Sequence, residues 1–197
     1  MNLTFESDTH TYKLDGVVIP SVTQVMKPLS DALYKSVDEN ILGVAAHRGS
    51  IVHESIEDYL NHGIDDIQPE YKGYLDAFKA FEHDYPFEVV GVEMRTYHEL
   101  LRYAGTVDLL CRIDGKLILI DYKTSARINE MLTGVQLEAY ASSLASNGIV
   151  IDDKAILHLK DNGKYTLKWY GKRSSESIAV FGACLTIYNH IMKFKEE

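Results

Sequence analysis

Two aspartates and a lysine around one tight turn are the residues whose types and spacing could do chemistry. Asp114-Gly115 is a dipeptide typical of a two-residue β-hairpin turn, and it stands between two apolar runs. In such a hairpin Asp108 faces Asp121, with their Cβ atoms about 4.5–5.5 Å apart. Lys123 follows two residues later, so we expect it on the same face of its strand.

This facing pair of carboxylates predicts a bound divalent cation, because like charges at opposed positions repel each other. A cation lowers the pKa of water and neutralises the charge that develops on a phosphate under attack, and a lysine ammonium adds positive charge at the same place. The pattern therefore predicts metal-assisted phosphodiester hydrolysis, with Asp108, Asp121 and Lys123 as the catalytic residues. In the alternative without a metal, Lys123 pairs with Asp121 and Asp108 has no partner.

The composition is that of a globular protein, with 46% hydrophobic and 25% charged residues in a chain of 197. No apolar run reaches the roughly 18 residues that a membrane span needs, and the first residues do not resemble a secretory signal. We therefore expect a cytoplasmic protein without a membrane segment, with a single domain over residues 1–197. Residues 1–43 are a possible N-terminal extension made of a hairpin and helices.

The net charge of −9 argues against a protein that coats nucleic acid by charge alone. It leaves room for an enzyme that contacts nucleic acid at one site. Residues 154–173 carry six lysines and arginines, which are either a local DNA contact or a solvated strand face. The only two cysteines, Cys111 and Cys184, cannot supply the four thiolates of a zinc or iron–sulfur site.

The two runs that flank the turn are apolar on both faces, which predicts strands buried on both sides. Helices must then cover both faces of a mixed central sheet, so the expected fold class is α/β (α+β). Apolar periodicity predicts helices that end at Gly63 and that span about 69–83, 130–146 and 174–194. Ser21 is expected to cap a short helix that ends near Pro28, before a second helix over about 30–40.

An aspartate on one strand and Asp-x-Lys on the next resembles the PD-(D/E)xK nuclease superfamily. Gly105-Thr106-Val107-Asp108 is similar to its G-x-x-D element, and Asp121-Tyr122-Lys123-Thr124 is similar to its D-x-K-T element. Residues 48–54 resemble the G-x-x-x-H helix motif of the RecB-like exonuclease branch, and residues 136–140 resemble that branch's Q-x-x-x-Y motif. Residues 20–26 look like the P-S-V-T element of mitochondrial genome-maintenance exonucleases and their phage relatives.

The resemblance implies a restriction-endonuclease-like fold and a deoxyribonuclease that depends on Mg²⁺ or Mn²⁺. By this resemblance His53, Asp108 and Asp121 bind the metal, with the backbone carbonyl of Tyr122 as a further ligand. Lys123 positions or deprotonates the attacking water. The four cysteines that many members of the branch use for an iron–sulfur cluster are missing, so we expect no such cluster, and a chain of this length has no room for a fused helicase.

Five further residues are candidates for the site. Glu93 is a possible metal ligand and Glu57 a possible hydrogen-bond partner of a ligand, although each could equally be an ordinary strand or surface residue. Gln136 and Tyr140 share one helix face, and the resemblance implies that they bind DNA or orient the site. Thr124 is a candidate DNA contact or a residue that stabilises the end of its strand.

The expected function is an exonuclease that acts from DNA ends, with single-stranded DNA preferred and the N-terminal helices as a cover over the strand. A structure-specific endonuclease of the same fold and a non-catalytic DNA-binding protein with a vestigial site are the alternatives, and RNA as the substrate stays open. His10 and Tyr12 could contact DNA, but a small hairpin without that role is the simpler interpretation.

Overall fold

The computed structural model describes residues 1–35 and 37–195, which form two sheets and the helices around them. The larger sheet has the order β4-β5-β6-β7-β8, and only the pair β6–β7 is parallel. Its strands are β4 (Glu88–His98), β5 (Tyr103–Ile113), β6 (Lys116–Lys123), β7 (Asp153–Leu159) and β8 (Tyr165–Trp169). The small antiparallel sheet contains β1 (Leu3–Glu6), β2 (Thr11–Leu14) and β3 (Val17–Ile19).

The turn between β5 and β6 confirms the predicted hairpin. Asp114 and Gly115 have φ angles of 49° and 76°, and two successive positive φ angles are what a type I′ turn requires. From this turn the ladder keeps one register up to the pair of Leu109 with Ile120. The next residues along the two strands are Asp108 and Asp121, so the carboxylates lie where the paired segment ends.

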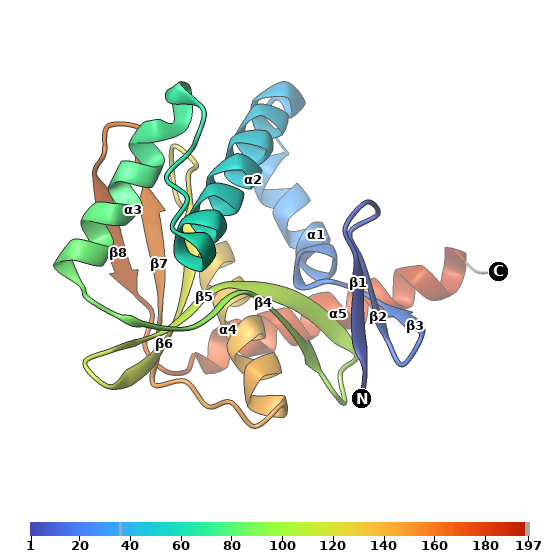
Figure 1. The fold of residues 1–197 in the computed structure, drawn as a ribbon. Helices are drawn as coiled ribbons and strands as arrows, with labels where there is room; N and C mark the ends of the chain where they lie inside the picture. The colour runs from blue at the N-terminus through green and yellow to red at the C-terminus, as the bar shows by residue number, and fades with distance from the viewer. Residues whose placement is uncertain (36, 196–197) are drawn as a thin grey trace.

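Helices cover both faces of the larger sheet, as predicted (Figure 1). The helices α2 (Glu39–His62) and α3 (Lys72–Asp84), with the short 3₁₀ helix η1 (Pro69–Tyr71) before α3, pack on one face. The helices α1 (Val22–Tyr34), α4 (Glu130–Ser146) and α5 (Ser175–Lys195) pack on the other. Side chains from the two faces of the sheet belong to two separate hydrophobic cores, one under each helix layer. This explains why the central strands of the sheet are apolar on both faces.

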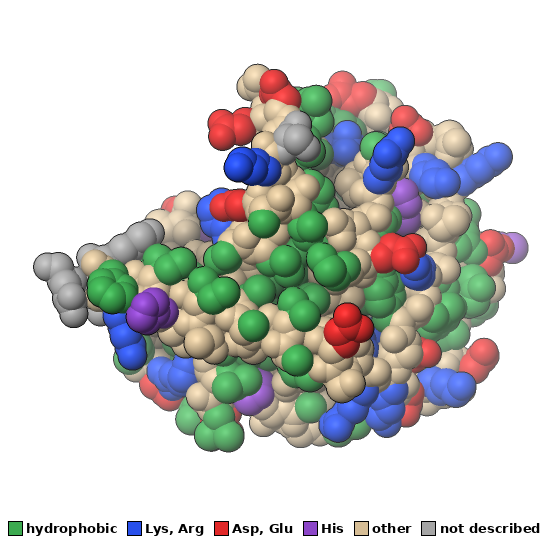
Figure 2. All heavy atoms as spheres, turned by 180° about the vertical axis from the view of Figure 1, so that it is seen from behind, with side chains coloured by type: hydrophobic (Ala, Val, Ile, Leu, Met, Phe, Trp, Pro, Cys, Tyr) green, Lys and Arg blue, Asp and Glu red, His purple; other side chains and the backbone are tan. Residues whose placement is uncertain are grey.

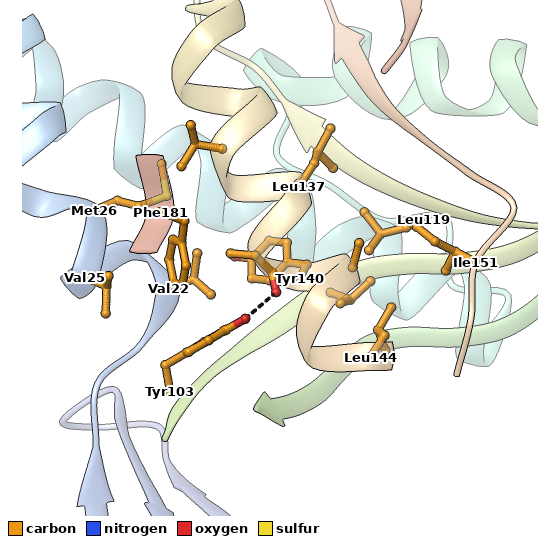
Figure 3. Close-up of a cluster of buried hydrophobic side chains, with 14 of the residues drawn as sticks. Val22, Val25, Met26, Tyr103, Leu119, Leu137, Tyr140, Leu144, Ile151 and Phe181 are labelled. Carbon is orange, nitrogen blue, oxygen red and sulfur yellow. Dashed lines mark hydrogen bonds between the residues drawn. The ribbon is translucent and has the colours of Figure 1, made fainter. Parts of the chain in front are cut away.

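The core beneath α4 joins the N-terminal segment to the sheet (Figure 3). Tyr103 from β5 is fully buried there, and its hydroxyl donates a hydrogen bond of 2.9 Å to the backbone oxygen of Ala139. Val22 and Val25 of α1 pack into the same cluster as Phe181 of α5. This shared core fixes α1 against the sheet that carries Asp108.

The first helix differs from the prediction. Ser21 caps it as expected, with its hydroxyl accepting from the Gln24 amide, but the helix runs through Pro28 to Tyr34 instead of ending there. Proline removes one helical hydrogen bond, at a cost of about 3 kcal/mol. Buried apolar side chains before Pro28 and the partly buried Leu29 after it pack against one core, and this packing keeps the helix continuous. The predicted second helix over 30–40 is therefore wrong, because residues 30–34 belong to α1 and α2 begins only at Glu39; residue 36 lies outside the described residues.

The back of the molecule, seen in Figure 2, carries many hydrophobic side chains at its surface. The last helix, α5, buries Phe181, Cys184 and Leu185 and leaves Ile187 and Ile191 exposed. Within the described ranges, no helix has the length and apolarity needed to cross a bilayer.

Candidate active site

Asp108 is fixed in place where β5 and β6 separate. Its Oδ2 accepts a hydrogen bond of 2.7 Å from the backbone N–H of Tyr122, and the residue is only 6% exposed. Its Oδ1 lies 3.6 Å from Nδ1 of His53, which α2 brings to the same place. One carboxylate is thus bonded to β6 through one oxygen and faces the histidine with the other.

Glu93 reaches this carboxylate from β4. Val92 pairs with Leu109 and Met94 with Val107, so Glu93 stands opposite Asp108 in the register of β4 and β5. Its backbone has φ 44°, a left-handed conformation that costs free energy in a residue with a side chain and that is concentrated at functional sites.

The side chain of Glu93 completes a small cluster of possible metal ligands. Its Oε1 lies 3.3 Å from Nδ1 of His53. His53, Glu93 and Asp108 each offer one ligand atom, and these atoms lie within 4.8 Å of one another. Glu93 was an open candidate in the sequence, and the structure brings it together with two of the predicted ligands.

Asp121 and Lys123 form an ion pair next to this cluster. The ammonium Nζ lies 2.5 Å from Oδ2 of Asp121, whose side chain is 2% exposed. Apart from this ammonium, Oδ2 has no hydrogen-bond partner among the described residues. The ammonium balances the charge of this buried carboxylate, and a bound cation would add a second positive partner.

Burial and mutual repulsion make the site electrostatically strained. Burial raises the pKa of Asp108 to about 7, and the charges of Asp121 and Glu93 add to this effect. Burial lowers the pKa of His53, but the carboxylates of Asp108 and Glu93 outweigh it and raise that pKa to about 9. Burial likewise lowers the pKa of Lys123, and Asp121 and Asp108 outweigh it, so the net shift is upward. The charged side chains of His53 and Lys123 are thus each stabilised by neighbouring carboxylates, and these carboxylates repel one another.

These donors fit a hard divalent cation. Carboxylate oxygens are the ligands that Mg²⁺ prefers, and Mn²⁺ also accepts an imidazole nitrogen. His53, Glu93 and Asp108 converge on one point, and Oδ2 of Asp121, which is paired with Lys123, is a further buried oxygen next to this group. The role of Asp121 and of the Tyr122 carbonyl as ligands stays a prediction.

The remaining candidates border the site in different ways. The side-chain amide of Gln136 donates to the Tyr140 hydroxyl at 3.1 Å, so the two residues form one unit on α4. A Cβ atom on Gly105 would come within 2.5 Å of the Tyr140 ring, which explains the glycine three residues before Asp108. Glu57 is half-buried, and its pKa is raised by burial and by repulsion from Glu93.

Two hollows open on either side of the catalytic residues. The first, of about 180 Å³, includes Asp108, Glu93 and Tyr140 in its lining and reaches the N-terminal sheet. The second, of about 360 Å³, is lined by Thr124, the residue after Lys123, and by basic side chains. These basic residues are Arg48, His158 and Lys160.

Of the basic residues in the second hollow, Lys160 belongs to the basic stretch 154–173 seen in the sequence, whereas Arg48 and His158 were not singled out. The Nε of Arg48 donates a long hydrogen bond of 3.5 Å to the Thr124 hydroxyl, which is 7% exposed. The position of Arg48 directly before the Gly49 motif was a signal that could have pointed to it. His158 stands beside Lys123 only through the parallel pairing of β6 and β7, which no local pattern announces.

Comparison with known proteins agrees with this geometry. Residues 31–164 match the family model of the PD-(D/E)XK nuclease superfamily. The chain belongs to this superfamily. The expected mixed sheet with helices on both faces is confirmed with it, and Asp108 and Asp121-Tyr122-Lys123 are the residues that resemble the motif for which PD-(D/E)XK nucleases are named. A comparison with curated proteins gave no match.

Several solved structures resemble this PD-(D/E)XK nuclease distantly. The crystal structure of SSO0001 is 14% identical, with 85% of this chain and 84% of that chain covered and a TM-score of 0.42. An alkaline exonuclease from Laribacter hongkongensis, LHK-Exo, is 12% identical, with 80% and 94% covered and a TM-score of 0.45. Its complex with dAMP covers 90% and 89% at 12% identity, with a TM-score of 0.46. Similarity at this level adds nothing to the assignment made by the family match.

Proposed function

We propose that this PD-(D/E)XK nuclease is a metal-dependent exodeoxyribonuclease of the RecB-like branch, which acts from DNA ends and prefers single strands. The observation that carries the proposal is the convergence of His53, Glu93 and Asp108 within 4.8 Å, beside the buried pair of Asp121 and Lys123. So many buried and half-buried charges are costly for a merely structural role, because each must be desolvated at least in part.

Each residue has a definite task in this proposal. Asp108, Glu93 and His53 would hold Mg²⁺ or Mn²⁺, with Asp121 as a further ligand. Such a cation supplies activation of water and neutralisation of the phosphate charge. Lys123, held by Asp121, places its ammonium where negative charge develops on the phosphate oxygens.

Basic side chains beyond Lys123 fit the path of a DNA backbone. Arg48, His158 and Lys160 line one hollow together with Thr124 and one acidic residue, Asp161, and phosphate contacts of this kind position a strand without reading its sequence. They provide locally what the overall charge of −9 does not. Gln136 and Tyr140 border the opposite side, so a strand that crosses the site would touch both groups.

The N-terminal helices support a preference for single strands and ends. The first half of α2 extends away from the larger sheet (Figure 1) and leaves Ile41, Leu42 and Val44 exposed. Exposed apolar side chains near an active site can contact the faces of unpaired bases, which unstack from their neighbours more easily than paired bases do. We therefore propose that α1 and α2 cover a strand that enters from its end.

The test uses purified protein with end-labelled linear single strands, linear duplexes, circular single strands and RNA, each with Mg²⁺, Mn²⁺ or EDTA. We expect metal-dependent degradation of linear single-stranded DNA and no cleavage of the circle. Lys123→Ala should abolish degradation, whereas Lys116→Ala, an exposed lysine at the other end of β6, should not.

Each competing function has its own outcome in this experiment. Cleavage of the circle would favour the structure-specific endonuclease, and preferential degradation of RNA would identify RNA as the substrate instead of DNA. If neither the wild type nor Lys123→Ala degrades any substrate, the non-catalytic alternative stands. If both degrade DNA equally, the catalytic role of Lys123 is refuted.

A further inference from the structure

We propose that the hollow between the N-terminal sheet and the metal cluster binds one unpaired nucleotide, with His10 as the ring on which its base stacks. This inference rests on the proposed nuclease function and deepens it, because it names the residue that selects an unpaired strand. The sequence alone favoured a hairpin without a role in binding.

The hollow connects the hairpin directly to the cluster. Its lining includes Asp108 and Glu93 of the cluster together with His10 and Tyr12 of the hairpin. Its volume is about 180 Å³. A cavity of roughly 150 Å³ holds one benzene molecule, so this hollow has room for a single aromatic ring but not for a base pair. A nucleotide whose phosphate lies at the cluster could therefore place its base here.

His10 is presented to the hollow by an unusual backbone. It ends the turn between β1 and β2, where its N–H donates to the backbone oxygen of Ser7 at 3.2 Å. Its φ of 49° is left-handed, a conformation in which histidine, asparagine and aspartate are enriched among residues with a side chain. The residue is exposed, whereas Tyr12 is 2% exposed. The turn therefore holds an exposed ring where it lines the same hollow as Asp108 and Glu93.

Other aromatic rings hold the imidazole in position. The His10 ring packs edge-to-face against Phe5 at 5.1 Å and against Tyr12 at 5.7 Å between centroids. Phe5 in turn contacts Tyr12 at 4.6 Å, and the guanidinium of Arg95 lies over Phe5 at 4.9 Å. Edge-to-face contacts use the edge of one ring and the face of another. A ring supported in this way stacks on a base at little further cost in side-chain entropy.

The hairpin itself is attached to the catalytic strand. The hydroxyl groups of Tyr12 and Thr106 share a hydrogen bond of 2.7 Å, and Thr106 stands two residues before Asp108 on β5. The amide of Ala104 on the same strand donates to the Pro20 backbone oxygen at 2.9 Å. His10 therefore keeps a fixed position relative to the metal cluster, as a specificity-determining residue must.

Stacking on a single ring explains discrimination between strands. Every nucleobase has a face that can stack, so the contact does not depend on sequence. In a duplex that face is covered by the neighbouring base pairs, and exposing it requires unstacking. A site built around His10 thus binds an unpaired nucleotide and rejects a paired one.

The experiment measures binding of single-stranded oligonucleotides in the Lys123→Ala background with Mn²⁺, so that no strand is cleaved. The variants are His10→Ala, His10→Phe and, as a matched control from the same turn, Thr9→Ala. Each is tested with an unmodified strand and with strands that carry an abasic site at successive positions from either end.

We expect His10→Ala to raise the Kd for the unmodified strand by about 5- to 100-fold, the effect of losing one base–aromatic stack. His10→Phe and Thr9→Ala should bind as the parent does. At one abasic position the parent should lose the same factor, and there His10→Ala should cause no further loss.

Two results would overturn the subsite. One is an unchanged Kd for His10→Ala, and the other is a loss that stays the same at every abasic position. Failure of the proposed function has a different signature, because it appears as absent degradation by the wild type. If the wild type degrades DNA and His10→Ala leaves the Kd unchanged, only the stacking subsite is refuted and the proposed nuclease function stands.

Discussion

Asp108→Asn should stabilise the metal-free protein while it abolishes nuclease activity. The substitution keeps the size of the side chain and an oxygen that can accept from the Tyr122 amide, now at 2.7 Å from Oδ2. It removes a buried negative charge from a place where Asp121 and Glu93 already repel it. The variant would therefore lose a metal ligand, and the folded protein would no longer bear the free-energy cost of burying that charge.

The structure sets the size of this effect. A carboxyl whose pKa rises from 3.8 to about 7 is less stable when ionised by about 4 kcal/mol, since each pKa unit corresponds to about 1.4 kcal/mol. This shift already includes the attraction of protonated His53, whose ring nitrogen lies 3.6 Å away. An asparagine amide is itself polar and costs free energy to bury, so we expect about 1–3 kcal/mol of added stability at pH 8.

The pH dependence gives the sign of the effect independently. An acid with a raised pKa in the folded state binds its proton more readily when folded, so the wild type should gain stability as the pH falls from above 7 towards 4. Asparagine does not titrate, so the difference between variant and wild type should be largest at pH 8 and should shrink by pH 5.

Urea unfolding in EDTA at pH 8 and pH 5 measures both differences. Asp121→Asn is the matched control, because it changes the facing aspartate in the same way but leaves the Lys123 ammonium without its partner at 2.5 Å. That variant should lose about 1–3 kcal/mol, less than a fully buried pair because Lys123 is partly exposed. A less stable Asp108→Asn at pH 8 would refute the reasoning about crowded carboxylates.

Three further predictions concern packing and metal binding. Gly73→Ala should destabilise the protein by more than 2 kcal/mol, because its Cβ would lie 1.7 Å from the backbone oxygen of Asp161. Gly182→Ala has open space around its Cβ and should instead stabilise the protein by up to about 1 kcal/mol. Chemical unfolding measures both changes. Gly105→Ala should displace the Tyr140 ring and lower kcat, while most of the free energy of unfolding is kept. An unchanged kcat would contradict the proposed role of that ring. Mn²⁺ at 100 times its Kd should raise the free energy of unfolding by about 2.7 kcal/mol, and EDTA should reverse this gain. If the unfolding midpoint does not shift with Mn²⁺, the protein has no metal site.

The sequence by itself determined the hairpin that carries the chemistry. Asp114-Gly115 allows few backbone conformations, and the turn that it forms dictates the pairing of every residue up to Leu109 and Ile120. Because side chains alternate with a period of two, this register also settles which residues share a face with Asp108. Local physics was enough here, so the prediction from the turn agreed with the structure.

Tertiary structure alone decided what surrounds that hairpin. Glu93 stands opposite Asp108 because β4 and β5 keep one register from the pair of His98 with Tyr103 to the pair of Gly91 with Leu110, and no two-residue turn signal fixes that register in the sequence. The helix through Pro28 persists because of a core assembled from distant segments. His10 lies at the metal cluster because the small sheet attaches to β5 through contacts that span more than 90 residues of sequence, as in the hydrogen bond from Tyr12. Such contacts depend on the packing of the whole chain, so a local pattern cannot determine them.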